Sequence, residues 1–464
     1  MSVETSLSKF KQNSLYSILF LWVITFPFRN SVLTFSIKGA EIYPNFLVTI
    51  ALVGFIFCFL RPNFKKTDKI YFGIVIMFLI YCILWILLNG LNFYALFDLH
   101  SMLMSVSYAY IIFSLAANFG WDQAKQLLSK LLIFCISVLV FFGIYEMITE
   151  VHIMGSNVSK LMEYPISSTF NAPFFIYDNQ NDYCLYLFLS VHLLLIVNER
   201  FRLQKWIYLL LLLLILLFGW LAQARLVMLI STAFVGFFAV YHFLRSAPFI
   251  TMRNNWKFIL AFVFLIGCLF LSNDFFKGSD YRNSSKSILQ RSYFVDSTGS
   301  PRTYKQLDLE SKKEIDESFK KLKIAPDESR SDRIRYNLLQ NGLMMITSHP
   351  ILGVGPGQFN YILSTSETPY PIAEVYNPHN FVIEVIAQYG LLGWVYFGFM
   401  LYLIVVLFQL KFDDPYLKAM LLLLIFLYPI IGLIPSSFSY INLHWLFLPV
   451  IVCIYNNQKA AIEK

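Results

Sequence analysis

The stretch "WIYLLLLLLILLFGWLAQARLVMLISTAFVGFFAV", residues 206–240, decides the class of fold. A helix needs about 20 consecutive apolar residues to cross the hydrocarbon core of a bilayer. The stretch is long enough for two crossings, and its one charged residue, Arg225, stands near the middle. The pattern therefore predicts two neighbouring membrane-spanning helices, with Arg225 in the short connection between them.

The rest of the chain repeats this pattern. Of the 464 residues, 58% are hydrophobic and 14% are charged, against roughly 25% charged residues in an average soluble domain. Apolar blocks of spanning length begin near residues 14, 42, 70, 100, 131, 183, 206, 226, 258, 391, 419 and 440. We therefore expect an all-α integral membrane protein with about twelve transmembrane helices.

The distribution of basic residues predicts the orientation of these helices, because short cytoplasmic loops carry an excess of Lys and Arg. With the N-terminus inside, the inside segments hold 18 such residues, and the short outside segments hold Arg29, Lys38, Lys160 and Arg225. Both termini are therefore predicted to be cytoplasmic. The net charge of +8 then reflects topology, and it gives no reason to expect a nucleic-acid partner.

This topology divides the chain into three parts. Residues 1–271 are expected to hold spans 1–9, and residues 391–464 are expected to hold spans 10–12 and a short cytoplasmic tail. Residues 272–390 form a large, partly helical external loop between spans 9 and 10. Exposed segments on a rigid scaffold commonly carry function, so the loop is where we look for a site.

One amphipathic helix is predicted within the loop, from residue 332 to residue 347. Ile334, Leu338, Met345 and Ile346 fit one helical face, and Pro350 ends the helix. Two arginines, at positions 333 and 335, flank that face about 200° apart. Only one of the two arginines can easily point at a given site, and the spacing alone leaves both open.

A second helix is predicted to begin at "NPHN". Asn377 is a plausible N-cap and Pro378 suits the first helical position, which places His379 and Asn380 in the first turn. A helix N-terminus favours anions and disfavours an imidazolium ion. His379 is therefore a candidate general base beside an anion site, although a histidine that only satisfies backbone groups fits the same pattern.

The segment between these helices, "HPILGVGPGQF", has glycines at alternate positions: Gly353, Gly355 and Gly357. Glycine permits sharp turns and close backbone approach. The segment does not match a phosphate-binding fingerprint, since no Gly-Lys-Ser/Thr follows and no strand-helix-strand unit surrounds it. We expect the glycines to support a site by joining the two helices with little side-chain bulk.

The residues that bind metals are scattered along the sequence. The six cysteines lie in or beside apolar blocks without CxxC spacing, which is typical of buried small hydrophobic residues. The sequence groups no His, Cys, Asp and Glu at metal-ligand spacing. We therefore expect neither a metal site nor a cofactor.

Two motifs in order, "RYNLLQNGLMMITSHPILGVGPGQF" and "PHNFVIEVIAQYGLLG", resemble the signature region of the O-antigen ligase and polymerase superfamily. Members of this superfamily are bacterial inner-membrane enzymes that move glycans from undecaprenyl diphosphate carriers. The close match covers residues 335–393, and the rest of the chain agrees in span number, loop position and orientation. The resemblance implies a GT-C-like membrane fold.

The resemblance also implies roles for individual residues. His379 corresponds to the catalytic histidine of the His-Asn motif, with Asn380 and Glu384 beside it. Arg335 corresponds to the arginine of the external loop, with Arg333 as the alternative, and whichever of the two faces the site would bind diphosphate.

Arg225 corresponds to the family's second arginine, which usually follows a span as a Ser-Arg pair. This chain has "QAR" there and so departs from the pattern. A charge at membrane depth costs about 2.5 to 3.5 kcal/mol on insertion scales, and such residues are functional candidates by default. An arginine that only extends to the interface fits the position as well.

The implied activity is a metal-independent glycosyltransferase of lipopolysaccharide or polysaccharide biosynthesis. Its donor would be an undecaprenyl-diphosphate-linked glycan, its acceptor a sugar hydroxyl on lipid A core or on a growing polysaccharide, and its site periplasmic. The sequence does not decide between ligase and polymerase. A protein O-oligosaccharyltransferase is a further alternative, and so is a transporter or flippase of lipid-linked glycan, because twelve spans also suit secondary transporters.

Overall fold

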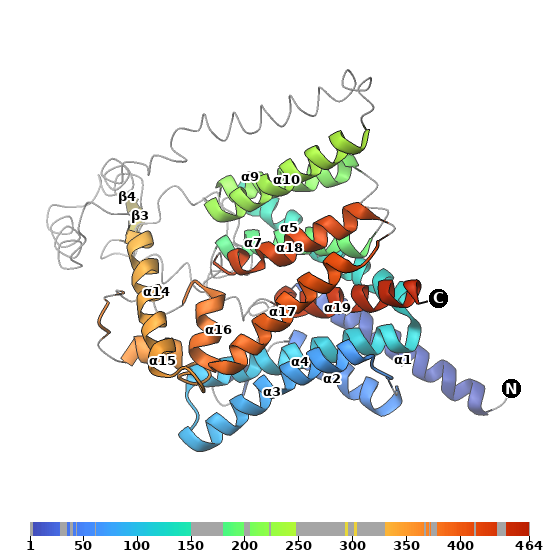
Figure 1. Cartoon of the computed structure of the whole chain (residues 1–464), viewed down its shortest axis with the longest axis horizontal. Helices are drawn as coiled ribbons and strands as arrows, with labels where there is room; N and C mark the ends of the chain where they lie inside the picture. Colours follow the sequence, from blue (N-terminus) through green and yellow to red (C-terminus); the bar gives the residue numbers. More distant parts are fainter. Residues whose placement is uncertain are drawn as a thin grey trace.

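The computed structural model of the chain describes residues 3–27, 35–37, 40–42, 44–60, 62–149, 180–198, 205–221, 224–246, 293–295, 301–303, 330–365, 368–370, 372, 378–412, 414–433 and 442–463. Within these ranges the chain is mainly helical (Figure 1). The described strands form two short antiparallel pairs, in which β1 (Phe35–Ile37) joins β2 (Ala40–Ile42) and β3 (Tyr293–Val295) joins β4 (Pro301–Thr303). The expected helical fold class is thus confirmed.

Eleven long helices of the described ranges overlap eleven of the predicted spans. They are α1 (Val3–Thr25), α2 (Pro44–Phe59), α3 (Lys66–Asn89), α4 (Phe93–Phe119), α5 (Trp121–Thr149), α7 (Gln180–Val197), α9 (Lys205–Leu221), α10 (Arg225–Ser246), α17 (Leu391–Gln409), α18 (Pro415–Ile431) and α19 (Asn442–Ile462). The span predicted to begin near residue 258 lies outside the described residues.

Four described helices are long and apolar enough to cross a membrane by themselves. They are α3, α4, α17 and the segment Trp121–Glu146 of α5. Several others, including α2 and α18, are apolar but shorter. The structure therefore supports a membrane protein, while the number of twelve spans and their orientation stay predictions.

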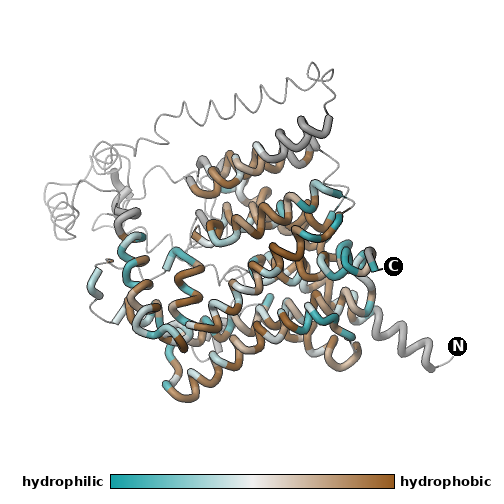
Figure 2. Tube along the Cα trace, in the orientation of Figure 1, coloured by the Kyte–Doolittle hydropathy of each residue, from teal (hydrophilic) through white to brown (hydrophobic). Residues whose placement is uncertain are grey.

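The long helices consist mostly of hydrophobic residues (Figure 2), and many of their large apolar side chains are exposed. Leu88 is 83% exposed and Leu87 is 74% exposed on α3, and Phe408 is 70% exposed on α17. Soluble monomers rarely expose large contiguous apolar patches. A surface of this kind is expected where acyl chains of the bilayer cover it.

The two ends of the helix bundle carry different parts of the chain. Figure 1 shows both chain termini on one side and helix α14 (Arg330–Ser348) on the opposite side. Lys65, at the start of α3, donates from Nζ to the carbonyl of Asn456 near the end of α19 at 3.2 Å. Lys125 near the start of α5 and Lys459 near the end of α19 belong to the set predicted to be cytoplasmic.

Two hydrophobic clusters organise the described part of the chain. The larger cluster joins the long helices. The smaller one joins α14, α15 (Gln358–Thr365) and α16 (Phe381–Tyr389) through Leu338, Phe359 and Ala387, among others. Figure 1 draws α14 and α16 side by side, steeply across the direction of the long helices. Because α16 also contributes Phe381 and Val385 to the larger cluster, it connects the two.

Candidate active site

His379 lies directly in front of helix α16 and has an unusual backbone conformation. Its φ is 49°, the one positive value at a non-glycine residue in the part of the chain that the structure describes. The left-handed region costs an L-residue about 1–2 kcal/mol, although histidine occupies it more often than most residues do. Strained residues of this kind concentrate at functional sites and persist where the surrounding structure holds them.

The N-cap of α16 is Asn380. Its side chain accepts a hydrogen bond from the backbone N–H of Ile383 at 3.2 Å. The expectation that Asn377 caps the helix and that His379 lies in its first turn is therefore wrong. Asparagine is favoured at either position, so the sequence alone could not choose between them. His379 stands just before the positive end of the helix dipole, not inside the first turn.

Phe381, the first residue of α16, is fixed by the ends of two other helices. Its backbone N–H donates to the carbonyl of Gly432, which follows α18, at 3.0 Å. Its ring meets the ring of the buried His444 of α19 edge to face, with centroids 4.6 Å apart. The ring of His444 in turn stacks on that of Tyr428 of α18, with centroids 5.2 Å apart. These contacts place the turn that carries His379.

Helices α14 and α16 run in the same direction. The segment after α14 bonds to the last turn of α16, because Val354 and Gly355 donate their N–H groups to the carbonyls of Ala387 and Gln388 at 2.8 and 3.1 Å. Nearer the start of α16, Gly342 of α14 faces Ile383 so closely that a β carbon would overlap its side chain. The C-terminal ends therefore meet at the glycine segment, and the N-terminal ends lie on the same side.

The face of α14 that meets α16 carries position 335. Arg335 and Gly342 are seven residues apart and therefore lie within about 20° of each other around the helix axis. Arg335 is half-buried. Position 333 is nine residues from Gly342 and lies on the opposite side of the helix by the same spacing. The helix geometry thus favours Arg335 over Arg333 as the residue directed toward the turn of His379.

The three glycines adopt positive φ and press against neighbouring backbone or rings. Gly353 has φ 72° and meets the carbonyl of Gln388, Gly355 has φ 107° and meets the indole of Trp85, and Gly357 has φ 69° and meets the backbone of Tyr94. The glycines are expected to support a site by joining the two helices with little side-chain bulk. They hold the C-terminal ends, about 13 Å along α16 from His379, and so act at a distance.

Asp98 of α4 is a residue that the sequence analysis missed. Its Oδ2 accepts the N–H of Gly357 at 2.8 Å and the hydroxyl of Tyr389 at 3.1 Å, and the residue is 1% exposed. It therefore ties the glycine segment and the last residue of α16 to a long helix of the bundle. An acidic residue at the edge of an apolar block was the available signal, since ionisable residues within membrane spans are functional candidates by default.

Two further residues of the predicted site, Glu384 and Arg225, lie in different helices. Glu384 is buried within α16. Arg225 is the first residue of α10, and α10 packs against α18, whose C-terminal end adjoins Phe381. Figure 1 shows the N-terminal end of α10 on the same side of the bundle as α16. The N-terminal ends of α10, α14 and α16 thus lie on one side.

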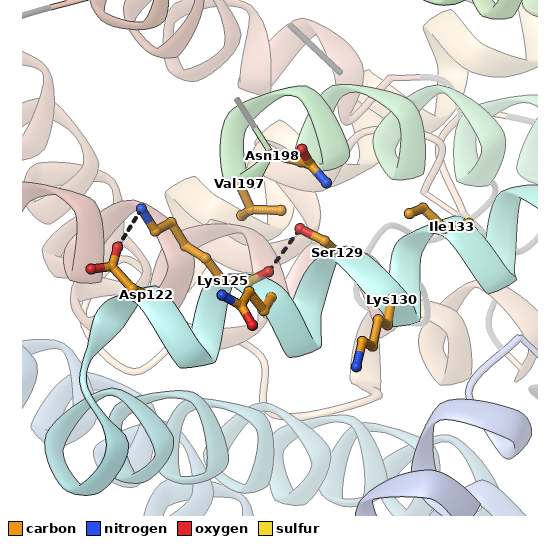
Figure 3. Close-up of a pocket in the computed structure, with 8 residues that line it drawn as sticks. Asp122, Lys125, Ser129, Lys130, Ile133, Val197 and Asn198 are labelled. Carbon is orange, nitrogen blue, oxygen red and sulfur yellow. Dashed lines mark hydrogen bonds and ion pairs between the residues drawn. The ribbon is translucent and has the colours of Figure 1, made fainter. Parts of the chain in front are cut away.

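A cavity of about 600 Å³ lies at the other end of the bundle (Figure 3). It is lined by the start of α5 and the end of α7, including Ser129, Lys130 and Val197, and by the ion pair between Lys125 Nζ and Asp122 at 2.7 Å. Its lining includes none of the predicted site residues. It is therefore not the candidate active site.

Among the described residues, no three or more His, Cys, Asp or Glu side chains are grouped so that they could hold a metal ion. The residues predicted for the site are instead two arginines and a histidine that precedes a helix N-terminus. This set of groups is suited to binding an anion and moving a proton.

Two comparisons with known proteins bear on the family of this chain. Comparison with curated protein sequences finds no match. A family model described as O-Antigen ligase matches residues 185–398, which run from α7 into α17 and include Arg225, Arg335 and His379. The match supports the resemblance of this chain to the O-antigen ligase and polymerase superfamily.

Proposed function

We propose that the protein is an O-antigen ligase or polymerase-type glycosyltransferase. It moves a glycan from an undecaprenyl diphosphate carrier to an acceptor sugar hydroxyl, on lipid A core or on a growing polysaccharide, at the periplasmic face of a bacterial inner membrane. The observation that carries the proposal is the parallel packing of α14 on α16, which directs Arg335 and His379 to the same end of the pair. The family match supports the general class of activity.

In the proposed reaction His379 acts as a general base. The imidazole takes the proton of the acceptor hydroxyl, whose oxygen attacks the anomeric carbon of the donor glycan. The new glycosidic bond forms as the bond from that carbon to the diphosphate oxygen breaks, and the proton then leaves His379 for water. A positioned base typically contributes about 10² to 10⁴ in rate.

The leaving diphosphate needs positive charge around it. Arg335 supplies a guanidinium from α14 and Arg225 supplies a second one from the start of α10, and each can bind phosphate oxygens with two parallel hydrogen bonds. Charge that develops in the transition state is best stabilised by groups already in place. In this scheme two guanidinium groups and a helix N-terminus do this, so we propose that the reaction requires neither a divalent cation nor a cofactor.

The test is transfer by purified protein in liposomes that contain a lipid-linked glycan. New glycosidic product should accumulate with either a lipid A core acceptor or a second carrier-linked glycan, and it should form at the same rate in excess EDTA. The His379→Ala protein is the matched control and should form none. Movement of the lipid-linked glycan across the membrane without a new bond would overturn the proposal in favour of a flippase, and dependence on Mg²⁺ would overturn the metal-independent scheme.

Deletion of the gene separates the two acceptors. Loss of glycan from lipid A, with polymer left on the carrier, is expected for a ligase. A ladder reduced to single repeats is expected for a polymerase.

A further inference from the structure

Two large apolar side chains lie exposed in the turn between α14 and the glycine segment. Ile351 is 69% exposed and Leu352 is 66% exposed. The turn belongs to the loop predicted to be external, where water would be expected to surround it. Nevertheless, hydrogen bonds to two helices fix the backbone of this turn. The two side chains are therefore exposed on an ordered segment.

The turn is fixed between two helices that are apolar enough to cross the membrane. The carbonyl of Leu352 accepts a hydrogen bond from the hydroxyl of Tyr81 of α3 at 2.6 Å, and the carbonyl of Ile351 accepts one from the N–H of Leu391, the first residue of α17, at 2.8 Å. Both α3 and α17 are candidate membrane spans. The turn therefore fills the gap between two lipid-facing helices.

The position of these contacts along α3 shows how far the turn lies from the C-terminal end of that helix. Tyr81 precedes Asn89, the last residue of α3, by eight residues, which corresponds to about 12 Å along the helix. The side chain of Trp85, only four residues from the end, adjoins Gly355. The turn therefore lies below the outer end of α3, not above it.

The surface around the turn is continuous with the lipid-facing surface of these helices. On α3 the exposed side chains include Leu84 and Leu88, and on α17 they include Leu391 and Trp394. Ile351 and Leu352 extend this apolar surface across the gap. Tryptophan is enriched at membrane interfaces, which is consistent with the level inferred from Tyr81.

We infer that Ile351 and Leu352 insert into the outer leaflet of the bilayer and that lipid acyl chains cover them. The continuity with α3 and α17 assigns this occupant, since those helices already face lipid. The loop is thus anchored at the membrane surface. Because the same segment bonds the C-terminal end of α16, the anchor would hold His379 near the headgroups, where a donor diphosphate would lie. That last consequence rests on the proposed function, whereas the insertion does not.

Spin labels in liposomes of phosphatidylethanolamine and phosphatidylglycerol test the insertion. Single cysteines are placed at Leu352, at Leu88 as a lipid-facing reference and at the exposed Thr347 of α14 as the matched control, in full-length protein with its six native cysteines replaced by alanine. Collision with oxygen relative to a water-soluble nickel complex should be several-fold higher at position 352 than at position 347, and close to the value at position 88. Equal values at positions 352 and 347 would overturn the inference.

A second measurement keeps the native cysteines. Benzoylphenylalanine at position 352 should form photo-adducts with lipid acyl chains that mass spectrometry detects, and the same group at position 347 should form at least several-fold fewer. An absence of lipid adducts at position 352, in protein that elutes as a single species, would again overturn the inference. Neither measurement depends on turnover, so failure of the insertion is distinguishable from failure of the proposed glycosyl transfer.

Discussion

The two ends of helix α16 differ in burial and in backbone conformation. At the C-terminal end, Tyr389 and the glycine segment are buried, and the backbone carbonyls of Ala387 and Gln388 have hydrogen-bond partners. At the N-terminal end, His379 and Asn380 are only half-buried, and His379 has a positive φ. A short helix that is fixed at one end can present reactive groups at the other with little freedom of movement.

This difference explains why conspicuous sequence features and reactive residues need not coincide. The alternating glycines stand out in the sequence, yet they contact the C-terminal end of α16, which hydrogen bonds fix in place. The residue that we propose as the base, His379, directly follows Pro378, about 20 residues after the glycines. The comparison predicts that substitutions at the N-terminal end will reduce rate, while those at the C-terminal end will reduce stability.

The largest effect is expected at His379. Asparagine also occupies the left-handed region more readily than most residues, so His379→Asn should keep the turn and remove the base. We expect a rate loss of about 10³-fold, within the range for a positioned base, with an unchanged melting temperature in detergent. For the native protein, the rate of transfer should fall as the pH decreases and the imidazole becomes protonated, because a protonated ring cannot accept the acceptor's proton.

His349, at the exposed end of α14, is the control for this substitution. The His349→Asn protein should keep most of its rate. If His379→Asn retained more than about a tenth of the native rate, the N-terminal end would not contain the base.

The next effect concerns the choice between the two loop arginines. Arg335→Gln should reduce the rate about 10²-fold, which is typical for loss of one group that stabilises transition-state charge, and Arg335→Lys should retain part of the activity because it keeps the charge. Arg333→Gln, on the opposite side of α14, is the matched control and should reduce the rate only slightly. Steady-state transfer rates at saturating donor measure the difference.

A severe loss at position 333 together with a silent change at position 335 would show that α14 presents the other face to the site. Arg225→Gln provides an independent check. It should resemble Arg335→Gln if both guanidinium groups bind the same diphosphate.

The sequence predicts the helices well because their signals are local. Apolar length locates the long helices, and the positions of Ile334, Leu338 and Met345 identify the buried face of α14, which the smaller cluster confirms. Gly390, with φ 54°, separates α16 from α17. The resemblance to a family is likewise confirmed by the match over residues 185–398.

The sequence predicts the site less completely because its geometry depends on distant partners. The true cap is set by the burial of Phe381 against residues of α18 and α19, more than 40 positions away. The choice between Arg333 and Arg335 depends on the contact of Gly342 with Ile383. Asp98 acquires its role only when the chain brings Gly357 and Tyr389 to it.

At the C-terminal end, Gly357→Ala should lower stability. Its φ of 69° costs a residue with a β carbon about 1–2 kcal/mol, and the added carbon would overlap the backbone of Tyr94 and Ala95. We expect a loss of about 2 kcal/mol or more, measured as a lower melting temperature in detergent. Activity per folded molecule should change less than for His379→Asn.

Gly398 of α17 is the matched control for this change, since a β carbon there meets no heavy atom within 4 Å. Gly398→Ala should leave the melting temperature unchanged or slightly higher. If both alanine variants had the same melting temperature, the glycine segment would not fix the C-terminal end of α16.

The smallest effect is expected at Asn380, which caps α16 through the N–H of Ile383. Removal of an N-cap typically costs about 1 kcal/mol, so Asn380→Ala should lower the melting temperature slightly and loosen the turn of His379. Asn380→Ser keeps an oxygen that can accept the same hydrogen bond, and it should therefore restore both stability and most of the rate. A rate that stays low in the serine variant at native stability would mean that the Asn380 amide contacts the substrate directly, and the N-terminal end of α16 would then carry two reactive side chains instead of one.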